Sequence, residues 1–323
     1  MKAAVVFEAG KAPVFSDFEA PSAGAGQELI AVKAAALTQF TKSRASGAHY
    51  SADASLPAVA GSDGVGVTQD GRRVYFILPG APFGAMAELT RVREGFCVPV
   101  PDTLDDVTAA ALANPGMSAW AALVYRAQVK QGDTVLINGA TGIAGRLAVQ
   151  LAKHLGAGKV IATARDAAAL VSVQALGADV VLPFELDGRD PDGAAHFETA
   201  LTEQFKDGID VVVDYLWGPS AQTIITTIAK AVEDARPVRF VQVGSSSGGE
   251  ITLPGAALRS SAIMLMGSGI KSVSLPDLLA AVGHVFAAAI PANLRIATRV
   301  RPLADVQTAW NDDGKARVVF VPG

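Results

Sequence analysis

Three glycines, each separated from the next by two residues, place the tightest constraint on how this chain folds. They lie in the segment Gly139-Ala140-Thr141-Gly142-Ile143-Ala144-Gly145, directly after the apolar run Val135-Leu136-Ile137. Beyond the glycines, Leu147, Leu151 and Leu155 recur on one helical stripe. A buried strand that turns through glycines into an amphipathic helix predicts a βα unit. Further strands alternate with helices up to about residue 243, which indicates a parallel sheet in an α/β fold.

The same spacing is typical of a loop that binds a dinucleotide. One glycine permits the tight turn, a second lets backbone N–H groups approach a pyrophosphate, and the third lets the helix pack closely on the strand. The N-terminus of the helix adds a partial positive charge at that point. We therefore predict that the loop from Gly139 to Gly145 binds a nicotinamide dinucleotide. The alternative is a βα turn that binds nothing.

The end of the next strand bears on which dinucleotide is bound. An enzyme that uses NAD usually places a carboxylate there, on the adenosine ribose. This chain has Ala164, which leaves room, followed by Arg165, which can hold a 2′-phosphate by charge-assisted hydrogen bonds. The predicted cofactor is NADP(H). In the alternative, Arg165 is a solvated surface residue and Asp166 binds the ribose.

Composition and charge exclude several classes of protein. The 323 residues are enough for two domains, and 50% of them are hydrophobic. A net charge of −4 does not favour nucleic acid as a partner. No uninterrupted apolar run reaches the roughly 18 residues of a membrane span without Pro or Gly, so no membrane association is expected. The single cysteine, Cys97, excludes an intrachain disulfide and suits the cytoplasm.

Taken together, the motifs resemble the medium-chain dehydrogenase/reductase superfamily, and within it the zinc-free branch of NADPH:quinone oxidoreductase-like proteins. The resemblance covers almost the whole chain. Apart from the glycine loop, it is carried by Met1-Lys2-Ala3, Leu56-Pro57-Ala58-Val59-Ala60-Gly61-Ser62-Asp63-Gly64-Val65-Gly66, Gly71-Arg72-Arg73-Val74, Gly84-Ala85-Met86-Ala87-Glu88, Leu176-Gly177-Ala178-Asp179, Asp210-Val211-Val212-Val213-Asp214 and Val243-Gly244.

The resemblance implies a GroES-like, β-rich catalytic domain and a Rossmann domain with a doubly wound parallel sheet. We expect the first part of the catalytic domain at 1–118, the Rossmann domain at 119–258, and a return to the catalytic domain at 259–323. An independent reading of the residues agrees with this. The first hundred residues form short strands and turns, and the last segment lacks regular βαβ order.

Zinc enzymes of this superfamily have a cysteine and a His-Glu pair where this chain has Thr38 and Ser62-Asp63. The loop that binds a structural zinc is also absent. Because a stable zinc site needs about four N, S or O ligands, we expect no metal. Cys97 is better explained as a small buried residue.

The resemblance also implies candidates around the reacting groups. Tyr50 and His49 lie in a loop that borders the active site in relatives, and we expect them to orient or protonate a substrate. In the alternative they are two polar aromatics on a surface loop. The usual Asn and Asp before this loop are replaced by Thr38 and Thr41.

Other positions are expected to bind the cofactor. Ser118, which we expect at the start of a helix, is a candidate for the nicotinamide carboxamide or a phosphate, or it caps that helix. Val243-Gly244 and Gly267-Ser268 are expected to line the cofactor, although both pairs are also typical of turns. The expected activity is hydride transfer from NADPH to a quinone or an α,β-unsaturated carbonyl.

Two other functions fit the same residues. One is a non-catalytic NADPH-binding protein with a sensor or structural role, and the other is an alcohol dehydrogenase-type enzyme acting on an unknown carbonyl. A homodimer is expected from the resemblance, with the apolar segment Ile263-Met264-Leu265-Met266 as its edge.

Overall fold

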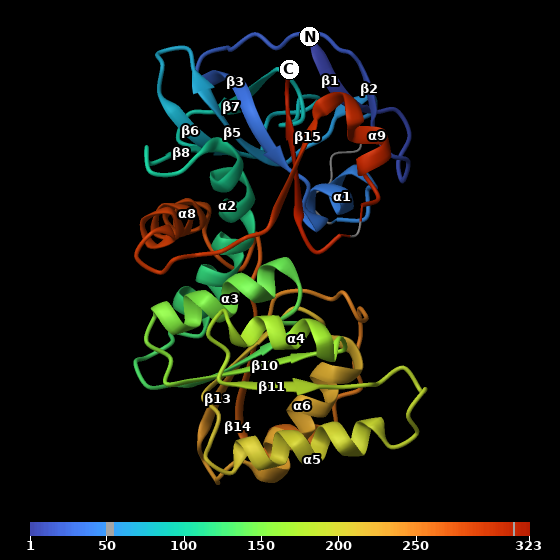
Figure 1. Ribbon diagram of the computed structural model, residues 1–323, viewed down its shortest axis with the longest axis vertical. Coiled ribbons are helices and arrows are strands. Elements are labelled where there is room, and N and C mark those ends of the chain that lie inside the picture. The colour runs from blue at the N-terminus through green and yellow to red at the C-terminus, as the bar shows by residue number, and fades with distance from the viewer. Residues whose placement is uncertain (50–54, 313) are drawn as a thin grey trace. The chain divides into compact units, whose positions relative to one another are not determined.

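The computed structural model describes residues 1–49, 55–312 and 314–323, and the chain divides into two compact units (Figure 1). Unit 1 comprises Met1–Pro115, Val282–Ile290 and Ile296–Gly323. Unit 2 comprises Gly116–Ala281 and Pro291–Arg295. The expected boundary after residue 258 differs from this division. Residues 259–281 join unit 2 because they contain a strand of its sheet.

Unit 2 contains a sheet of six parallel strands within the described residues. These are β9 (Thr134–Asn138), β10 (Lys159–Ala164), β11 (Val180–Pro183), β12 (Val211–Asp214), β13 (Pro237–Gln242) and β14 (Ala262–Gly267). Their spatial order is β11-β10-β9-β12-β13-β14. This is the doubly wound Rossmann order, so the predicted fold class is confirmed. The order reverses between β9 and β12, and a ligand of such a sheet binds at the carboxyl ends of the strands there.

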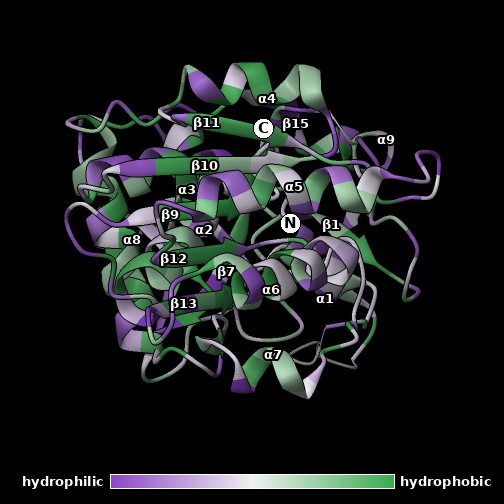
Figure 2. Ribbon diagram, turned by 90° about the horizontal axis from the view of Figure 1, so that it is seen from below, coloured by the Kyte–Doolittle hydropathy of each residue, from purple (hydrophilic) through white to green (hydrophobic). Residues whose placement is uncertain are grey.

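Helices lie on both faces of this sheet (Figure 1). They are α3 (Ile143–His154), α4 (Ala167–Gln174), α5 (Gly193–Phe205) and α6 (Gly218–Ala231), and a short α7 (Gly255–Arg259) precedes β14. Leu136, Ile161 and Val212 form one core cluster with residues of α5 and α6. In Figure 2 the strands are largely hydrophobic, whereas α4 and α5 show both colours. Strands buried on both faces have this continuous apolar character.

Unit 1 is built from two sheets whose strands pair antiparallel, apart from the parallel pair of β15 and β16. A small sheet has the order β2-β1-β4, with β1 (Lys2–Val6), β2 (Val14–Asp17) and β4 (Ala58–Val59). The larger sheet has the order β15-β16-β3-β5-β6-β8, and β7 also pairs with β3. Its strands are β3 (Gln27–Ala36), β5 (Asp63–Thr68), β6 (Arg73–Ile77), β7 (Leu89–Arg93), β8 (Cys97–Pro99), β15 (Thr298–Pro302) and β16 (Arg317–Val321). The last strand of the chain, β16, pairs antiparallel with β3 and so completes the sheet begun by the N-terminal segment.

The remaining helices are α1 (Gln39–Ala45), α2 (Asp106–Trp120), α8 (Leu275–Ala289) and α9 (Val306–Ala309), with a π-helical turn at Ala121–Arg126 after α2. Among the described residues, Asp106–Arg126 is the one helical stretch long and apolar enough to cross a membrane. Two thirds of its most apolar window, 67%, is buried inside the structure. A core helix passes the same test, so this is weak evidence for a membrane span.

A buried polar group lies in the core of unit 1, next to β16. The Asp63 carboxylate accepts hydrogen bonds from the Ser62 hydroxyl at 2.7 Å and from the Tyr75 hydroxyl at 3.0 Å. Arg317 donates to the Leu37 carbonyl at 2.8 Å, which ties β16 to the end of β3. Burial raises the pKa of Asp63, and the Arg317 charge opposes this rise. Burial lowers the pKa of Arg317 to about 10.

We predict that Asp63→Asn destabilises the protein by about 1–3 kcal/mol, because the amide leaves one of the two buried hydroxyl donors without its acceptor and removes the negative charge that acts on Arg317. Adding Arg317→Met should restore much of that loss, since both charges are then gone. Urea unfolding measures both effects. Asp17→Asn is the control, because the ion pair of Asp17 with Lys2 is exposed. Its loss should change the free energy of unfolding by less than about 0.5 kcal/mol. If the double variant is as unstable as the single one, electrostatic coupling is not the cause.

Candidate cofactor and substrate sites

The predicted phosphate loop connects β9 to α3 in unit 2, and its glycines are there for different reasons. Gly139 has φ +88°, a conformation that L side chains rarely adopt. A Cβ on Gly145 would lie 2.3 Å from the Gly139 carbonyl oxygen, so only glycine lets α3 approach the loop this closely. A Cβ on Gly142 would meet its nearest protein atom at 3.5 Å, which is an ordinary contact. Packing within the protein therefore does not require glycine at position 142.

Hydrogen bonds hold the loop against β10. The Gly139 and Ala140 N–H groups both donate to the Thr163 carbonyl, at 2.9 and 3.0 Å. Gly142 is the N-cap residue of α3, and no side chain caps the helix there. The first N–H groups of a helix have no intrahelical partner, and their dipoles favour an anion. The loop and helix end therefore fit a pyrophosphate.

A buried polar cluster joins the strand ends at the point where the strand order reverses. The Asn138 amide of β9 donates to the Asp214 carboxylate of β12 at 2.8 Å and to the Ser220 hydroxyl at 2.9 Å. Its carbonyl oxygen accepts from the Thr163 hydroxyl of β10 at 2.7 Å. All four side chains are buried. Burial raises the pKa of Asp214 to about 6. The cluster fixes three strand ends on which the loop rests.

Asp214 also determines the turn that follows β12. Its carboxylate accepts the N–H groups of Leu216 at 3.0 Å and of Trp217 at 3.1 Å. Trp217 has φ +56° and ψ −153°, a region occupied almost entirely by glycine. Its ring packs against Phe240 at 6.3 Å. The side chain is partly buried and packs at the edge of the core cluster. The strained backbone could not be read from the sequence.

Tyr215 is the other bulky residue of this turn. Its Cβ lies close to the phosphate loop, since a Cβ on Gly139 would lie 3.4 Å from it. Burial raises the pKa of its hydroxyl, and the Ser118 hydroxyl beside it opposes that rise. The Tyr215 hydroxyl has no regular hydrogen-bond partner among the described residues. Ser118 lies near the end of α2 rather than at its start, so the expected position, and with it the alternative as a capping residue, is wrong. The helix runs through Pro115 and Gly116, although a Pro-Gly pair is a common signal for a turn.

Ala164, Arg165 and Asp166 lie where β10 passes into α4. Ala164 is the last residue of the strand and is buried, whereas Arg165 is exposed. Asp166 is the N-cap residue of α4 and accepts the Ala169 N–H at 2.9 Å. The carboxylate that was the alternative ligand of the ribose is thus engaged by the helix end.

The two other predicted cofactor segments follow β13 and β14. The N–H groups of Val243 and Gly244 donate to the Asp214 carbonyl at 2.7 and 3.1 Å. Ser268 donates its N–H to the Gln242 carbonyl at 2.8 Å. Gly267 lines a cavity of about 450 Å³ together with Trp217 and Gln242. Because parallel strands end at one edge of a sheet, these segments share that edge with the phosphate loop.

In unit 1, a chain of hydroxyl groups links α1 to the start of β5. Thr38 caps α1 and donates to the Thr41 hydroxyl at 3.0 Å, and Thr41 is 2.9 Å from the Ser62 hydroxyl. Ser62 then donates to Asp63. All four are buried. Their polar atoms are satisfied by one another, and hydroxyls are poor zinc ligands.

No group of three or more His, Cys, Asp or Glu side chains that could hold a metal ion occurs among residues 1–49, 55–312 and 314–323. Cys97 is partly buried against the core of unit 1. Burial raises the pKa of its thiol to about 12, so it is a neutral thiol near pH 7.

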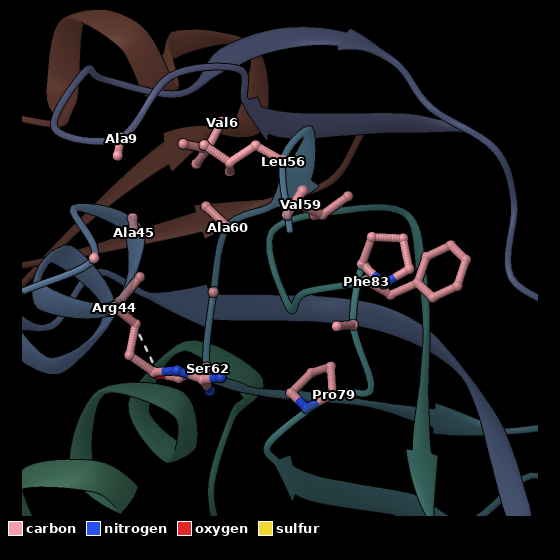
Figure 3. A pocket seen from close by; sticks show the side chains of 16 residues that line it. Val6, Ala9, Arg44, Ala45, Leu56, Val59, Ala60, Ser62, Pro79 and Phe83 are labelled. Atoms are coloured by element: carbon pink, nitrogen blue, oxygen red, sulfur yellow. Dashed lines mark hydrogen bonds between the residues drawn. The ribbon is translucent and has the colours of Figure 1, made fainter. Parts of the chain in front are cut away.

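Thr41 and Ser62 also reach the wall of a pocket within unit 1 (Figure 3). Its volume is about 320 Å³. Most lining side chains are apolar, and the polar ones are those two hydroxyls and Arg44; the apolar ones include Val6, Leu56, Val59, Pro79 and Phe83. The pocket suits a small apolar molecule with a polar group at one end.

Of the two predicted catalytic residues, Tyr50 lies outside the described residues. The ring of His49 packs edge-on against Phe40 at 4.9 Å. Partial burial, and then the charge of Arg44, lower the pKa of His49 below 6.5. His49 is therefore neutral at pH 7 and can donate a hydrogen bond, but it is a poor general acid there.

The loop geometry leads to a paired prediction. Gly145→Ala forces α3 away from the Gly139 carbonyl and should lower the free energy of unfolding by about 1–3 kcal/mol and abolish dinucleotide binding. Gly142→Ala should cost less than about 1 kcal/mol, since its Cβ has room, yet still weaken binding at least about tenfold by obstructing the ligand. Urea unfolding and a fluorescence titration give the two quantities. Equal stability of Gly145→Ala and the unmodified protein would disprove the close approach.

Comparison with known proteins places this geometry in a family. Residues 144–282 match a family model described as zinc-binding dehydrogenase. A probable NADPH-dependent quinone reductase from Emericella nidulans is 30% identical over 96% of this chain and 96% of its own length. A chloroplastic NADPH-dependent alkenal/one oxidoreductase from Arabidopsis thaliana is 36% identical over 57% of this chain and 52% of its own.

A solved mycobacterial structure, determined in complex with NADPH, superimposes with a TM-score of 0.83 at 25% identity, covering 100% of both chains. The near-complete coverage by a relative at 30% identity carries the assignment, and the shared fold agrees with it. The chain belongs to the medium-chain dehydrogenase/reductase superfamily, in its quinone reductase-like branch.

Proposed function

We propose that this protein is an NADPH-dependent oxidoreductase that reduces a quinone or an α,β-unsaturated carbonyl without zinc. One observation carries the proposal. A phosphate loop in which Gly145 tolerates no Cβ lies in a chain similar over nearly its whole length to an NADPH-dependent quinone reductase. The cofactor is NADP(H), and the enzyme is quinone reductase-like. The proposal adds the substrate class and the independence from zinc.

The cofactor would be held at the carboxyl edge of the parallel sheet. The loop from Gly139 to Gly145 and the start of α3 bind the pyrophosphate through backbone N–H groups. The nicotinamide end is lined by Ser118 and by two short segments at the ends of β13 and β14. These segments are Val243-Gly244 and Gly267-Ser268. Arg165, just beyond Ala164, binds the 2′-phosphate. Capping of α4 by Asp166 supports this assignment, because that carboxylate is already engaged.

Bound NADPH supplies a hydride, and the protein supplies position and polarity. The hydroxyl chain of Thr38, Thr41 and Ser62 supports a zinc-free site, because its members bond to one another and to Asp63. Without a Lewis acid, the substrate must already be activated by conjugation, as quinones and enones are. The apolar pocket of unit 1 suits such a ring.

Tyr50 and His49 are the proposed groups that orient the substrate or supply the proton. The role of Tyr50 remains a prediction from the sequence. The lowered pKa of His49 favours a hydrogen-bonding role for its neutral imidazole. Between the two, the tyrosine is the better candidate for the proton.

A homodimer in the cytoplasm completes the proposal. Strand β14 pairs only with β13 among the described strands, and Met264 and Leu265 are 44% and 38% exposed. An apolar sheet edge of this kind pairs readily with a second strand. We assign that strand to β14 of a second copy.

The cofactor assignment predicts that NADPH binds at least about tenfold more tightly than NADH, a difference of about 1.4 kcal/mol. Arg165→Ala should remove most of that preference. Fluorescence titration with both nucleotides measures it, and Arg259→Ala, an exposed arginine in α7, is the matched control. Equal binding of NADH by the unmodified protein would place the ribose on Asp166 instead.

The reaction predicts NADPH oxidation with a panel of quinones and enones that is unchanged by a strong zinc chelator. A protein that binds NADPH but reduces no member of the panel would be the non-catalytic alternative. Activity lost to the chelator and restored by zinc would indicate the alcohol dehydrogenase-type enzyme.

If Tyr50 supplies the proton to the reduced substrate, Tyr50→Phe should lower kcat by about 10- to 100-fold. This is near the lower end of what a positioned acid contributes. His49→Gln should change kcat by less than about threefold at pH 7.5, because the imidazole is neutral there and glutamine keeps an N–H donor. Steady-state kinetics from pH 5.5 to 8.5 separates the two. The reverse ranking would make His49 the proton donor.

A further inference from the structure

Arg146, in the first turn of α3, is held by two different parts of unit 2. Its Nε donates to the Thr141 carbonyl of the phosphate loop at 3.1 Å. Its Nη2 donates to the Ser172 hydroxyl of α4 at 2.8 Å. Ser172 is itself held, because it donates to the Ala169 carbonyl at 2.6 Å. The guanidinium therefore bridges the phosphate loop and the helix after β10.

This position follows from the geometry of helices. Side chains of an α-helix lean toward its N-terminus, so an arginine in the first turn reaches back over the loop that precedes it. The two anchors fix the guanidinium before any ligand binds, which lowers the entropy lost on binding. An arginine has five N–H donors, and the two anchors use two of them. Three donors remain for an anion.

The anchors also locate the guanidinium relative to the cofactor. In a Rossmann domain the adenosine ribose lies between the phosphate loop and the end of the second strand, which here is β10. Arg146 contacts the phosphate loop at Thr141 and, at Ser172, the helix that follows β10, so it lies on the side of unit 2 where that space opens. A 2′-phosphate carries about two negative charges and is the only part of the cofactor that distinguishes NADPH from NADH.

Arginines are the cations near this space that could bind the 2′-phosphate. Helix α4, whose residues are Ala-Ala-Ala-Leu-Val-Ser-Val-Gln, contains no cation. Neither Arg146 nor Arg165 forms a salt bridge with an acid in the described part of unit 2; the acid nearest in sequence, Asp166, is engaged as the cap of α4. Arg165 alone would have to neutralise a dianion from an exposed position. A second, anchored cation makes the site complete.

We propose that Arg146 binds the 2′-phosphate of NADPH together with Arg165, and that Ser172 positions it for this contact. The inference rests on NADP(H) as the cofactor. It adds a specificity-determining residue on α3, outside the β10–α4 turn that contains Arg165.

The test is a titration of the full-length protein with NADPH, NADH, adenosine 2′,5′-bisphosphate and AMP. Arg146→Ala should weaken binding of NADPH and the bisphosphate by about 10- to 100-fold, and binding of NADH and AMP by less than about threefold. Arg146→Lys keeps the charge but not both anchors, so its affinity for NADPH should lie between those of Arg146→Ala and the unmodified protein. Ser172→Ala should weaken NADPH about three- to tenfold, because the arginine loses one anchor.

Arg259→Ala controls for loss of a positive charge elsewhere in unit 2, and thermal unfolding shows whether each variant is folded. Equal weakening of NADPH and NADH by Arg146→Ala would overturn the proposal, because the arginine would then hold the loop or the pyrophosphate. Unchanged NADPH binding would overturn it as well. If Arg165→Ala abolishes the NADPH preference and Arg146→Ala does not, this inference fails while the proposed function stands. If the unmodified protein shows no preference, the cofactor assignment fails instead.

Discussion

The contact between Gly145 and the Gly139 carbonyl is the constraint on which the architecture of unit 2 depends. A Cβ at Gly145 would lie 2.3 Å from that oxygen. Because α3 approaches the loop so closely, its first N–H groups lie at the carboxyl edge of the sheet, where the strand order reverses. The positions of Gly142, Arg146 and the turn after β12 are set relative to this contact. A single added methyl group would displace them together.

Buried polar groups organise the sites of both units. In unit 2, Asn138 links three strand ends through Thr163, Asp214 and Ser220. In unit 1, Asp63 serves a comparable purpose, since it accepts from Ser62 and Tyr75 close to the Arg317 charge. Burying such groups is costly unless they are paired, so each cluster specifies one arrangement of the elements around it.

The hydroxyl chain in unit 1 extends this buried polar group. Thr38, Thr41 and Ser62 bond to one another and to the Asp63 carboxylate, so each hydroxyl is already engaged within the protein. The zinc-free reaction that we propose rests on this arrangement, because hydroxyls are poor zinc ligands.

Local sequence patterns determined a large part of this protein. The spacing of the glycines, the apolar run before them and the leucine stripe after them are short-range features, and the βα unit and the parallel sheet follow from them. The family resemblance rests on equally local motifs. The replacements at Thr38, Ser62 and Asp63 could also be read from the chain, because only residue identity mattered.

Long-range pairing decided the rest. Strand β14 belongs to unit 2 because it bonds to β13, which no local pattern after residue 258 indicates. Ser118 lies inside a helix because tertiary packing overrides the Pro115-Gly116 signal. The positive φ of Trp217 exists because the Asp214 carboxylate holds its N–H. Arg146 could not be recognised in the sequence, because its partners Thr141 and Ser172 belong to different elements and only the folded sheet brings those elements together.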